Sequence, residues 1–320
     1  MTIMGLGIKT KILGTNIGNW VHCYYSMKKN GHKRTRKGKP IYFIIGFDDP
    51  QKSGWTVWER VVLYNCIYAK DHGMIPVVDM KNYRSIYSEK NDCRKVNVWD
   101  QFYLQPGGVS LEQAMESGNY LIADSSPEWF SYIRARYPKR IKNMDYLRTA
   151  YSEYIKLRPD VETELHNRLM QLTSGNENAR ILTLCIRGTD YKKFAHMKQP
   201  PVETLLSLGE KVFADYKCDY YYLATEDLAY VEQFKASLPE NKVIVYDSGI
   251  IKNYKDGFIG EIIRGSVGEY KASMDYLTVL YIMNKSVALI GGLCGATIVA
   301  EYKRNPEYEY INIIDMHERY

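Results

Sequence analysis

The chain has 320 residues, of which 45% are hydrophobic and 25% are charged, and its formal net charge at pH 7 is +6. These values are typical of a soluble globular protein long enough for two domains, and they argue against a disordered or fibrous chain. No run reaches the roughly 18 apolar residues that a membrane-spanning helix needs, and the first residues lack the core and cleavage site of a signal peptide. We therefore expect a cytoplasmic protein.

The first 40 residues contain a strongly basic segment, residues 28–39, with the sequence KKNGHKRTRKGK. A solvated loop is one interpretation. A peripheral contact with an anionic membrane at the inner face, or with an anionic carrier lipid, is a second. Nucleic acid is a third, but we do not expect it, because no helix-turn-helix pattern or RNA-stacking motif accompanies the basic residues.

The residues that follow predict a parallel α/β domain. Strands are expected at 41–47, 74–80 and 120–124, and helices at 55–71 and 110–117. The first helix is expected to stop at His72-Gly73. Strand, glycine-containing loop, helix and strand in this order is the unit of a Rossmann-like sheet with right-handed crossovers.

A second α/β domain is predicted after a helical region at 144–173 that is interrupted near Pro159. The Ser/Gly/Asn-rich stretch at 173–179, TSGNENA, is the best candidate for the linker. Strands are expected at 180–186, 220–225, 242–247, 286–291 and 308–315, with helices at 202–216, 227–237, 271–284 and 295–302. We therefore predict four parts: a basic segment (1–40), an acceptor-side domain (41–173), a nucleotide-binding domain (174–305) and a closing strand (306–320).

The cysteines and histidines do not suggest a metal site. The six cysteines have no CxxC spacing, the six histidines form no HExxH pair, and DxD is absent. We expect reduced, mostly buried thiols, no metal and no cofactor. A dehydrogenase is disfavoured, because no GxGxxG follows a predicted strand.

Polar residues and glycines follow three of the predicted strands in the second half. Arg187 and Asp190 end the strand in ARILTLCIRGTD (179–190), and TED (225–227) ends the next strand. The third, VALIGGLCGATIVAEY (287–302), has a glycine-rich turn that lets a phosphate approach backbone amides at a helix start. A surface ion pair and ordinary helix caps are the alternative explanation of these residues. Three such ends converge on one edge of one sheet, which favours a ligand site.

These motifs resemble those of the fucosyltransferase superfamily, which includes α1,6-, α1,2- and protein O-fucosyltransferases. CIRGTD resembles the family's HxRRxD, LATEDLAYVEQFK its ATDD strand and helix, and MDYLTVLYIMNKSVALIGGLCGA its final motif. Together they cover residues 180–305 in order. The first half matches only loosely, through SGW (53–55) and VWDQFYLQP (98–106). The resemblance is closest to bacterial polysaccharide-type members, and it implies a GT-B-like fold with two Rossmann-like domains facing across a cleft.

The resemblance also implies roles for individual residues. Arg187 would bind the donor pyrophosphate, Asp190 would order the loop or the nucleotide, and the glycine-rich turn would hold phosphate. The remaining members of the implied GDP-sugar site are Thr225, Glu226 and Asp227 near the nucleoside, Asp275 after a small shift of register, and Gly292, Cys294 and Gly295 in the turn. Cys185 and Gly188 stand where the family has a histidine and a second arginine; Lys192, Lys193 or Arg264 is a possible substitute cation.

The implied reaction is an inverting, metal-independent transfer of a sugar, fucose from GDP-fucose, to a hydroxyl of a glycan acceptor. His196 has the pKa and loop position of a general base, and Asp49 and its neighbour Asp48 are rivals. Trp55, Tyr83 and Trp99 are candidates for stacking on acceptor sugars, with core packing favoured for Trp99. Two other functions stay open: a nucleotide- or glycan-binding protein without turnover, and a membrane-surface or nucleic-acid-binding protein acting through residues 28–39.

Overall fold

In a computed structural model, the protein forms two compact units. The first comprises Met1–Ser53 and Val57–Arg158, and the second comprises Gly54–Thr56 and Pro159–Tyr320. The residues that the structure describes are 38–47, 54–83, 85–87, 96–125, 129, 133, 143–188, 191, 198–247, 268–302 and 307–316. Most of the basic segment 28–39 therefore lies outside the described residues.

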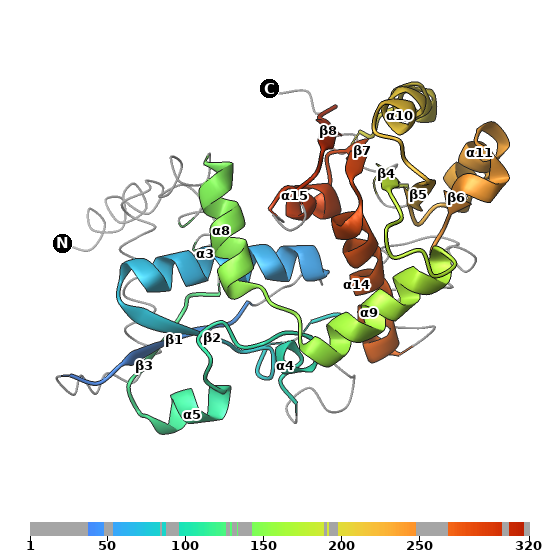
Figure 1. The fold of residues 1–320 in the computed structure, drawn as a ribbon. Coiled ribbons are helices and arrows are strands. Elements are labelled where there is room, and N and C mark those ends of the chain that lie inside the picture. The colour runs from blue at the N-terminus through green and yellow to red at the C-terminus, as the bar shows by residue number, and fades with distance from the viewer. Residues whose placement is uncertain are drawn as a thin grey trace, which may run out of the picture. The chain divides into compact units, whose positions relative to one another are not determined.

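A parallel sheet with the order β2-β1-β3 forms the centre of the described part of the first unit (Figure 1). Its strands are β1 (Ile41–Ile45), β2 (Met74–Val78) and β3 (Tyr120–Ile122), which confirms the strands predicted there. Apolar residues at helical spacing form the 17-residue helix that links the first two strands. The helices of this unit are α3 (Trp55–Asp71), α4 (Trp99–Phe102), α5 (Leu111–Glu116) and α8 (Met144–Tyr154).

A buried carboxylate joins three segments of this unit. Glu59 on α3 is 1% exposed, and its carboxylate accepts hydrogen bonds from the hydroxyls of Tyr103 (2.6 Å) and Tyr151 (2.8 Å). Burial, together with the charge of Glu59, raises the pKa of both tyrosines well above the ordinary value. The two donors offset the cost of burying a charge, so they fix α8 and the residue after α4 against α3.

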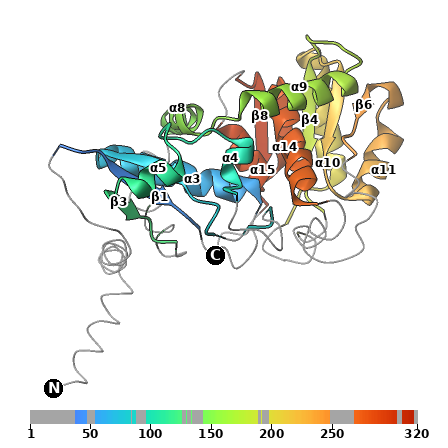
Figure 2. The same cartoon turned by 90° about the horizontal axis from the view of Figure 1, so that it is seen from below.

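The second unit is built on a parallel sheet with the order β6-β5-β4-β7-β8, and Figure 2 shows these strands side by side. The strands are β4 (Ile181–Cys185), β5 (Tyr220–Ala224), β6 (Val243–Ile244), β7 (Ala288–Gly292) and β8 (Tyr310–Ile314). The helices are α9 (Pro159–Leu172), α10 (Val202–Asp215), α11 (Leu228–Ser237), the 3-10 helix η3 (Glu240–Lys242), α14 (Glu269–Lys285) and α15 (Gly295–Glu301).

Successive side chains of β4 point to opposite faces of this sheet. Leu182 and Leu184 belong to a hydrophobic cluster with Leu205 of α10, and burying a leucine side chain contributes about 1.5–3 kcal/mol. Thr183 points to the other face, where its hydroxyl is 2.7 Å from the hydroxyl of Ser286. Figure 1 shows α10 and α11 on one side of the strands and α14 and α9 on the other. The α/β class with two parallel, Rossmann-like sheets is thus confirmed.

The boundary between the units lies at Arg158/Pro159, whereas the sequence suggested 173/174. The helical region is broken at residues 155–158, and its second helix, α9, packs against α14. Arg168 of α9 reaches Asp275 of α14, so this helix is part of the second unit. The predicted cleft between the two domains stays a prediction.

Candidate functional site

The candidate site lies at the carboxyl ends of the central strands of the second unit. From β4 the chain builds the sheet in one direction through β5 and β6, and then crosses to build β7 and β8 on the other side of β4. The strand order therefore reverses between β4 and β7. In open α/β sheets, ligands bind in the crevice outside the strand ends at such a switch point. Arg187 follows β4 there, and the glycine-rich turn follows β7.

Arg187 is held by Glu226, which follows the neighbouring strand β5. Arg187 Nε lies 3.0 Å from Glu226 Oε1, and the two side chains are only 20% and 14% exposed. The same carboxylate oxygen accepts the amide N–H of Gly188 at 3.1 Å. The guanidinium also lies 4.9 Å from the ring centre of Tyr191. The cation is therefore kept in one orientation at the end of β4.

Gly188, which the motif resemblance aligns with a second arginine, packs closely against Asp227. A Cβ atom at position 188 would lie 2.3 Å from both Cβ and Oδ2 of Asp227. Asp227 is itself the N-cap of α11, since its Oδ1 accepts the amide N–H of Ala229 at 3.0 Å. Thr225 Oγ1 accepts the amide N–H of Asp227 at 3.2 Å. The absence of a side chain at position 188 is thus part of how the β5–α11 turn packs.

Gln199 bridges the two strand ends, and the sequence analysis did not identify it. Its Oε1 accepts the amide N–H of Arg187 at 3.1 Å, and its Nε2 lies 3.3 Å from the carbonyl oxygen of Leu293. A Cβ at Gly292 would lie 2.3 Å from Gln199 Oε1, so this glycine leaves room for the bridge. A polar residue before two prolines gave no signal of such a role.

The glycine-rich turn offers fewer backbone donors than the sequence suggested. The amide of Leu293 donates to the carbonyl oxygen of Ile314 at 3.0 Å, and that of Cys294 donates to Thr297 Oγ1 at 2.9 Å. These two amides are paired within the protein, and phosphate binding by residues 292–295 stays a prediction. Gly295 opens α15, and a Cβ there would lie 2.6 Å from Thr56 Oγ1.

Two thiols meet beneath this turn. Cys185 ends β4, Cys294 is the N-cap of α15, and both are buried free cysteines that share a hydrogen bond. That hydrogen bond, together with the charge of Arg187 and the hydrogen bonds of Thr297, lowers the pKa of Cys294 to about 6. The same hydrogen bond and burial raise the pKa of Cys185 well above the ordinary value.

Asp275 lies in a separate network on α14. It is 1% exposed, and its carboxylate accepts a hydrogen bond from Tyr246 Oη at 2.7 Å. Arg168 Nη1 lies 3.2 Å from the same oxygen, and Lys271 pairs with the other. The carboxylate is thus engaged by three donors of its own unit, and its role in donor binding stays a prediction.

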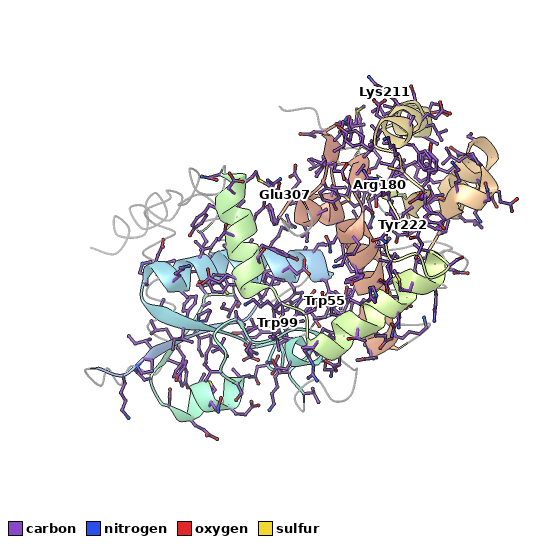
Figure 3. All side chains as sticks on the ribbon, viewed as in Figure 1. Trp55, Trp99, Arg180, Lys211, Tyr222 and Glu307 are labelled. Atoms are coloured by element: carbon purple, nitrogen blue, oxygen red, sulfur yellow. The ribbon has the colours of Figure 1, made fainter. Side chains whose placement is uncertain are left out.

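Several predicted residues cannot be placed in this site. His196, Asp48, Asp49 and Asp190 lie outside the described residues, as do Lys192, Lys193 and Arg264. Trp55 and Trp99, labelled in Figure 3, are both 0% exposed, so they pack in the interior and do not offer a ring face to a sugar. In the ranges that the structure describes, no three His, Cys, Asp or Glu residues form a group that could hold a metal ion.

Comparisons with known proteins give structural matches only. No family model matches the sequence, and the comparison with curated proteins gives no match. The fucosyltransferase NodZ from Bradyrhizobium matches 82% of this chain and 92% of its own, at 12% identity and a TM-score of 0.47. An arginine-to-lysine mutant of Arabidopsis thaliana FUT1 in complex with GDP matches 99% of this chain and 79% of its own, at 10% identity and a TM-score of 0.48.

A further match is the NodZ alpha-1,6-fucosyltransferase soaked with GDP-fucose, with 14% identity, a TM-score of 0.47 and coverage of 82% of this chain and 92% of that one. Among the described residues, no helix has both the length and the apolar character that crossing a membrane requires.

Proposed function

We propose that this chain is an inverting, metal-independent glycosyltransferase. It transfers a sugar, fucose from GDP-fucose, to a hydroxyl of a glycan acceptor in the synthesis of a bacterial surface polysaccharide. The observation that carries this proposal is the meeting of Arg187, Glu226 and the glycine-rich turn at the switch point of a Rossmann sheet. The motif resemblance over residues 180–305 supplies the class of donor.

The proposed reaction is a single displacement at the anomeric carbon. The acceptor oxygen forms a bond to that carbon as the bond to the diphosphate breaks, which inverts the configuration. Arg187 stabilises the negative charge that develops on the departing diphosphate. His196 takes the proton of the acceptor hydroxyl, with Asp49 as the alternative base.

The pairing of Arg187 suggests how it binds phosphate. Its Nε lies 3.0 Å from Glu226 Oε1. We assign phosphate binding to the two terminal nitrogens of the guanidinium, which form a planar fork suited to two phosphate oxygens. Glu226 then holds the cation in place while the donor enters, so the site is ordered before binding.

Thermal stabilisation by nucleotides tests the donor site. Wild type and Arg187→Ala are heated with GDP, UDP, CMP or ADP. A ligand at about 100 times its Kd adds about 2.7 kcal/mol of apparent stability. We expect selective stabilisation by GDP in the wild type and its loss in Arg187→Ala. Stabilisation by another nucleotide would keep the transferase and discard fucose; no response to any nucleotide would reject the donor site.

Arg180→Ala is a matched control, because Arg180 precedes the same strand at its opposite end. It contacts the carbonyl of Tyr216 and forms an ion pair with Glu309 at 2.7 Å. The variant should keep the response to GDP. Transfer of fucose to a mixed panel of glycan acceptors, including lipid-linked ones, then tests turnover.

A second candidate is a nucleotide- or glycan-binding protein of the same fold without turnover. Gly188 favours it, because the close approach of Asp227 leaves no room for the second arginine that would stabilise the leaving group. GDP binding without donor hydrolysis or transfer would support this candidate. Association of the wild type, but not of a variant lacking residues 28–39, with anionic vesicles would support the proposed membrane contact.

A further inference from the structure

The two thiols at the switch point are brought together by the fold. Cys185 is the last residue of β4, and its partner in the parallel ladder with β7 is Gly291, three positions before Cys294. Cys185 is 2% exposed and Cys294 is 4% exposed. The strand pairing and the start of α15 therefore place one thiol beside the other.

Gly291 keeps the space between the strand ends open. A Cβ at that position would lie 2.8 Å from Cys185 Cβ and 3.2 Å from Thr297 Cγ2. Thr297 is also a neighbour of the second thiol, since its Oγ1 lies 3.6 Å from Cys294 Sγ. A side chain at Gly291 would press into the region where the thiols and Thr297 meet.

The surroundings favour one proton shared by the pair. Cys294 Sγ receives hydrogen bonds from Cys185 and Thr297 and faces the charge of Arg187. Cys185 also lies in the field of Glu226, which opposes its ionisation. Cys294 is therefore suited to be the attacking thiolate, and Cys185 the thiol that resolves the product.

We propose that Cys185 and Cys294 form a reversible oxidation site that reacts with hydroperoxides. The Cys294 thiolate attacks one peroxide oxygen, an S–O bond forms, the O–O bond breaks, and the hydroxide that leaves takes a proton to become water. Cys185 sulfur then attacks the sulfenic sulfur, forming the S–S bond and breaking the S–O bond. The second oxygen leaves as water with the proton of Cys185. The two sulfurs lose the two electrons that reduce the peroxide. A small dithiol then reduces the disulfide back to two thiols and is itself oxidised to a disulfide.

Because the pair is buried, reagents reach it during local opening of this part of the unit, and hydrogen peroxide needs the least opening because it is small. The resulting bond joins the end of β4 to the first turn of α15, between Arg187 and the glycine-rich turn. This site does not depend on the proposed transferase activity, because its product is measured on the protein itself.

Peptide mapping tests the proposal on the full chain. Reduced protein is treated with hydrogen peroxide, remaining thiols are blocked with N-ethylmaleimide, and the unreduced digest is analysed by mass spectrometry. We expect a cross-linked peptide pair containing Cys185 and Cys294 that disappears after dithiothreitol. Neither Cys185→Ser nor Cys294→Ser should form it, and the Cys185→Ser variant should instead give a sulfenic acid at Cys294 that dimedone captures.

Cys218→Ser is the matched control, because Cys218 is a buried thiol whose pKa burial raises to about 11. The variant should leave the cross-link unchanged. In the wild type, Cys218 should be oxidised at least about tenfold more slowly than Cys294. A cross-link to a different cysteine, or equal oxidation of Cys218 and Cys294, would overturn the proposal. A second measurement needs no variant: phenylarsine oxide, which bridges two adjacent thiols, should protect both from N-ethylmaleimide. Failure to protect them would also overturn it.

Discussion

The carboxylate of Glu226 holds Arg187 in place: one oxygen lies 3.0 Å from Arg187 Nε and also accepts the next backbone amide at 3.1 Å. This arrangement orients the cation that follows β4 and partly neutralises it. The two effects oppose each other in the binding of an anionic donor, because orientation favours binding and neutralisation weakens it. A substitution that keeps the shape and removes the charge separates them.

Glu226→Gln should strengthen GDP binding about fivefold, which corresponds to about 1 kcal/mol. The amide oxygen of Gln can still accept from Gly188, while the charge that competes with the diphosphate is gone. Isothermal titration calorimetry at low salt measures the affinity, with Glu232→Gln on the exposed face of α11 as the control. Weaker binding would instead place Glu226 against the nucleoside, as the motif resemblance implies.

Gly188→Ala should lower the free energy of unfolding by about 1–3 kcal/mol, because its Cβ meets the side chain of Asp227. Asp227→Ala alone should cost about 1 kcal/mol through loss of the α11 cap. The double variant should cost somewhat less than the sum, since alanine at position 227 removes the 2.3 Å contact with Oδ2 but keeps the one with Cβ. Urea unfolding followed by circular dichroism measures all three, and strict additivity would contradict the predicted contact.

Gly209→Ala is the control for this cycle. Gly209 lies inside α10, where a Cβ would be 3.3 Å from Leu184 Cδ2, the end of a flexible side chain. Alanine also gains about 0.5–1 kcal/mol over glycine in a helix. The net change should therefore be small, and an equally large loss would show that the effect at position 188 is not specific.

Asp275→Asn should lower the thermal midpoint, because the positive charges of Arg168 and Lys271 lose their common partner. We expect a cost of about 1–3 kcal/mol, limited by the partial exposure of both cations. Glu164→Gln, which removes the half-exposed partner of Arg168, should change stability by less than about 0.5 kcal/mol. Unchanged stability with lost GDP binding would instead support the donor-binding role for Asp275.

The reactivity of Cys294 should follow pH with a midpoint near 6, the pKa to which Cys185, Arg187 and Thr297 lower it. Because the thiolate is the nucleophile, its alkylation by iodoacetamide should rise as pH passes through about 6 and then level off. Cys218, with a pKa of about 11, should still be accelerating at pH 9. Peptide mapping after timed quenching gives both rates.

The Cys185→Ser variant tests whether Cys185 causes the lowered pKa of Cys294. Serine is a poorer partner for the sulfur of Cys294, so the midpoint should move upward toward the ordinary value of 9.0. A midpoint near 9.0 already in the wild type would contradict the predicted thiolate. An unchanged midpoint in the variant would assign the shift to Arg187 and Thr297.

Local patterns were sufficient for most of the elements. The apolar residues Ile181, Leu182, Leu184 and Ile186 predicted β4, and the helical spacing of apolar residues predicted α3 within its observed bounds. The strand predicted at 242–247 shrinks to Val243–Ile244, because β6 is the edge of the sheet and pairs only with β5. Periodicity reports which residues favour a strand, but the partner decides how many of them pair.

The candidate site likewise combines features that the sequence predicted with contacts that only the tertiary structure shows. The sequence determined that Arg187, residues 225–227 and the glycine-rich turn each follow a strand, since apolar runs and their polar ends are local features. Only the tertiary structure decided that Glu226 holds Arg187, that Gln199 bridges β4 to β7, and that Asp275 pairs with Arg168, 107 positions away. The physical reason is that a side chain's partner is set by which strands and helices become neighbours, and that choice depends on burial over the whole unit.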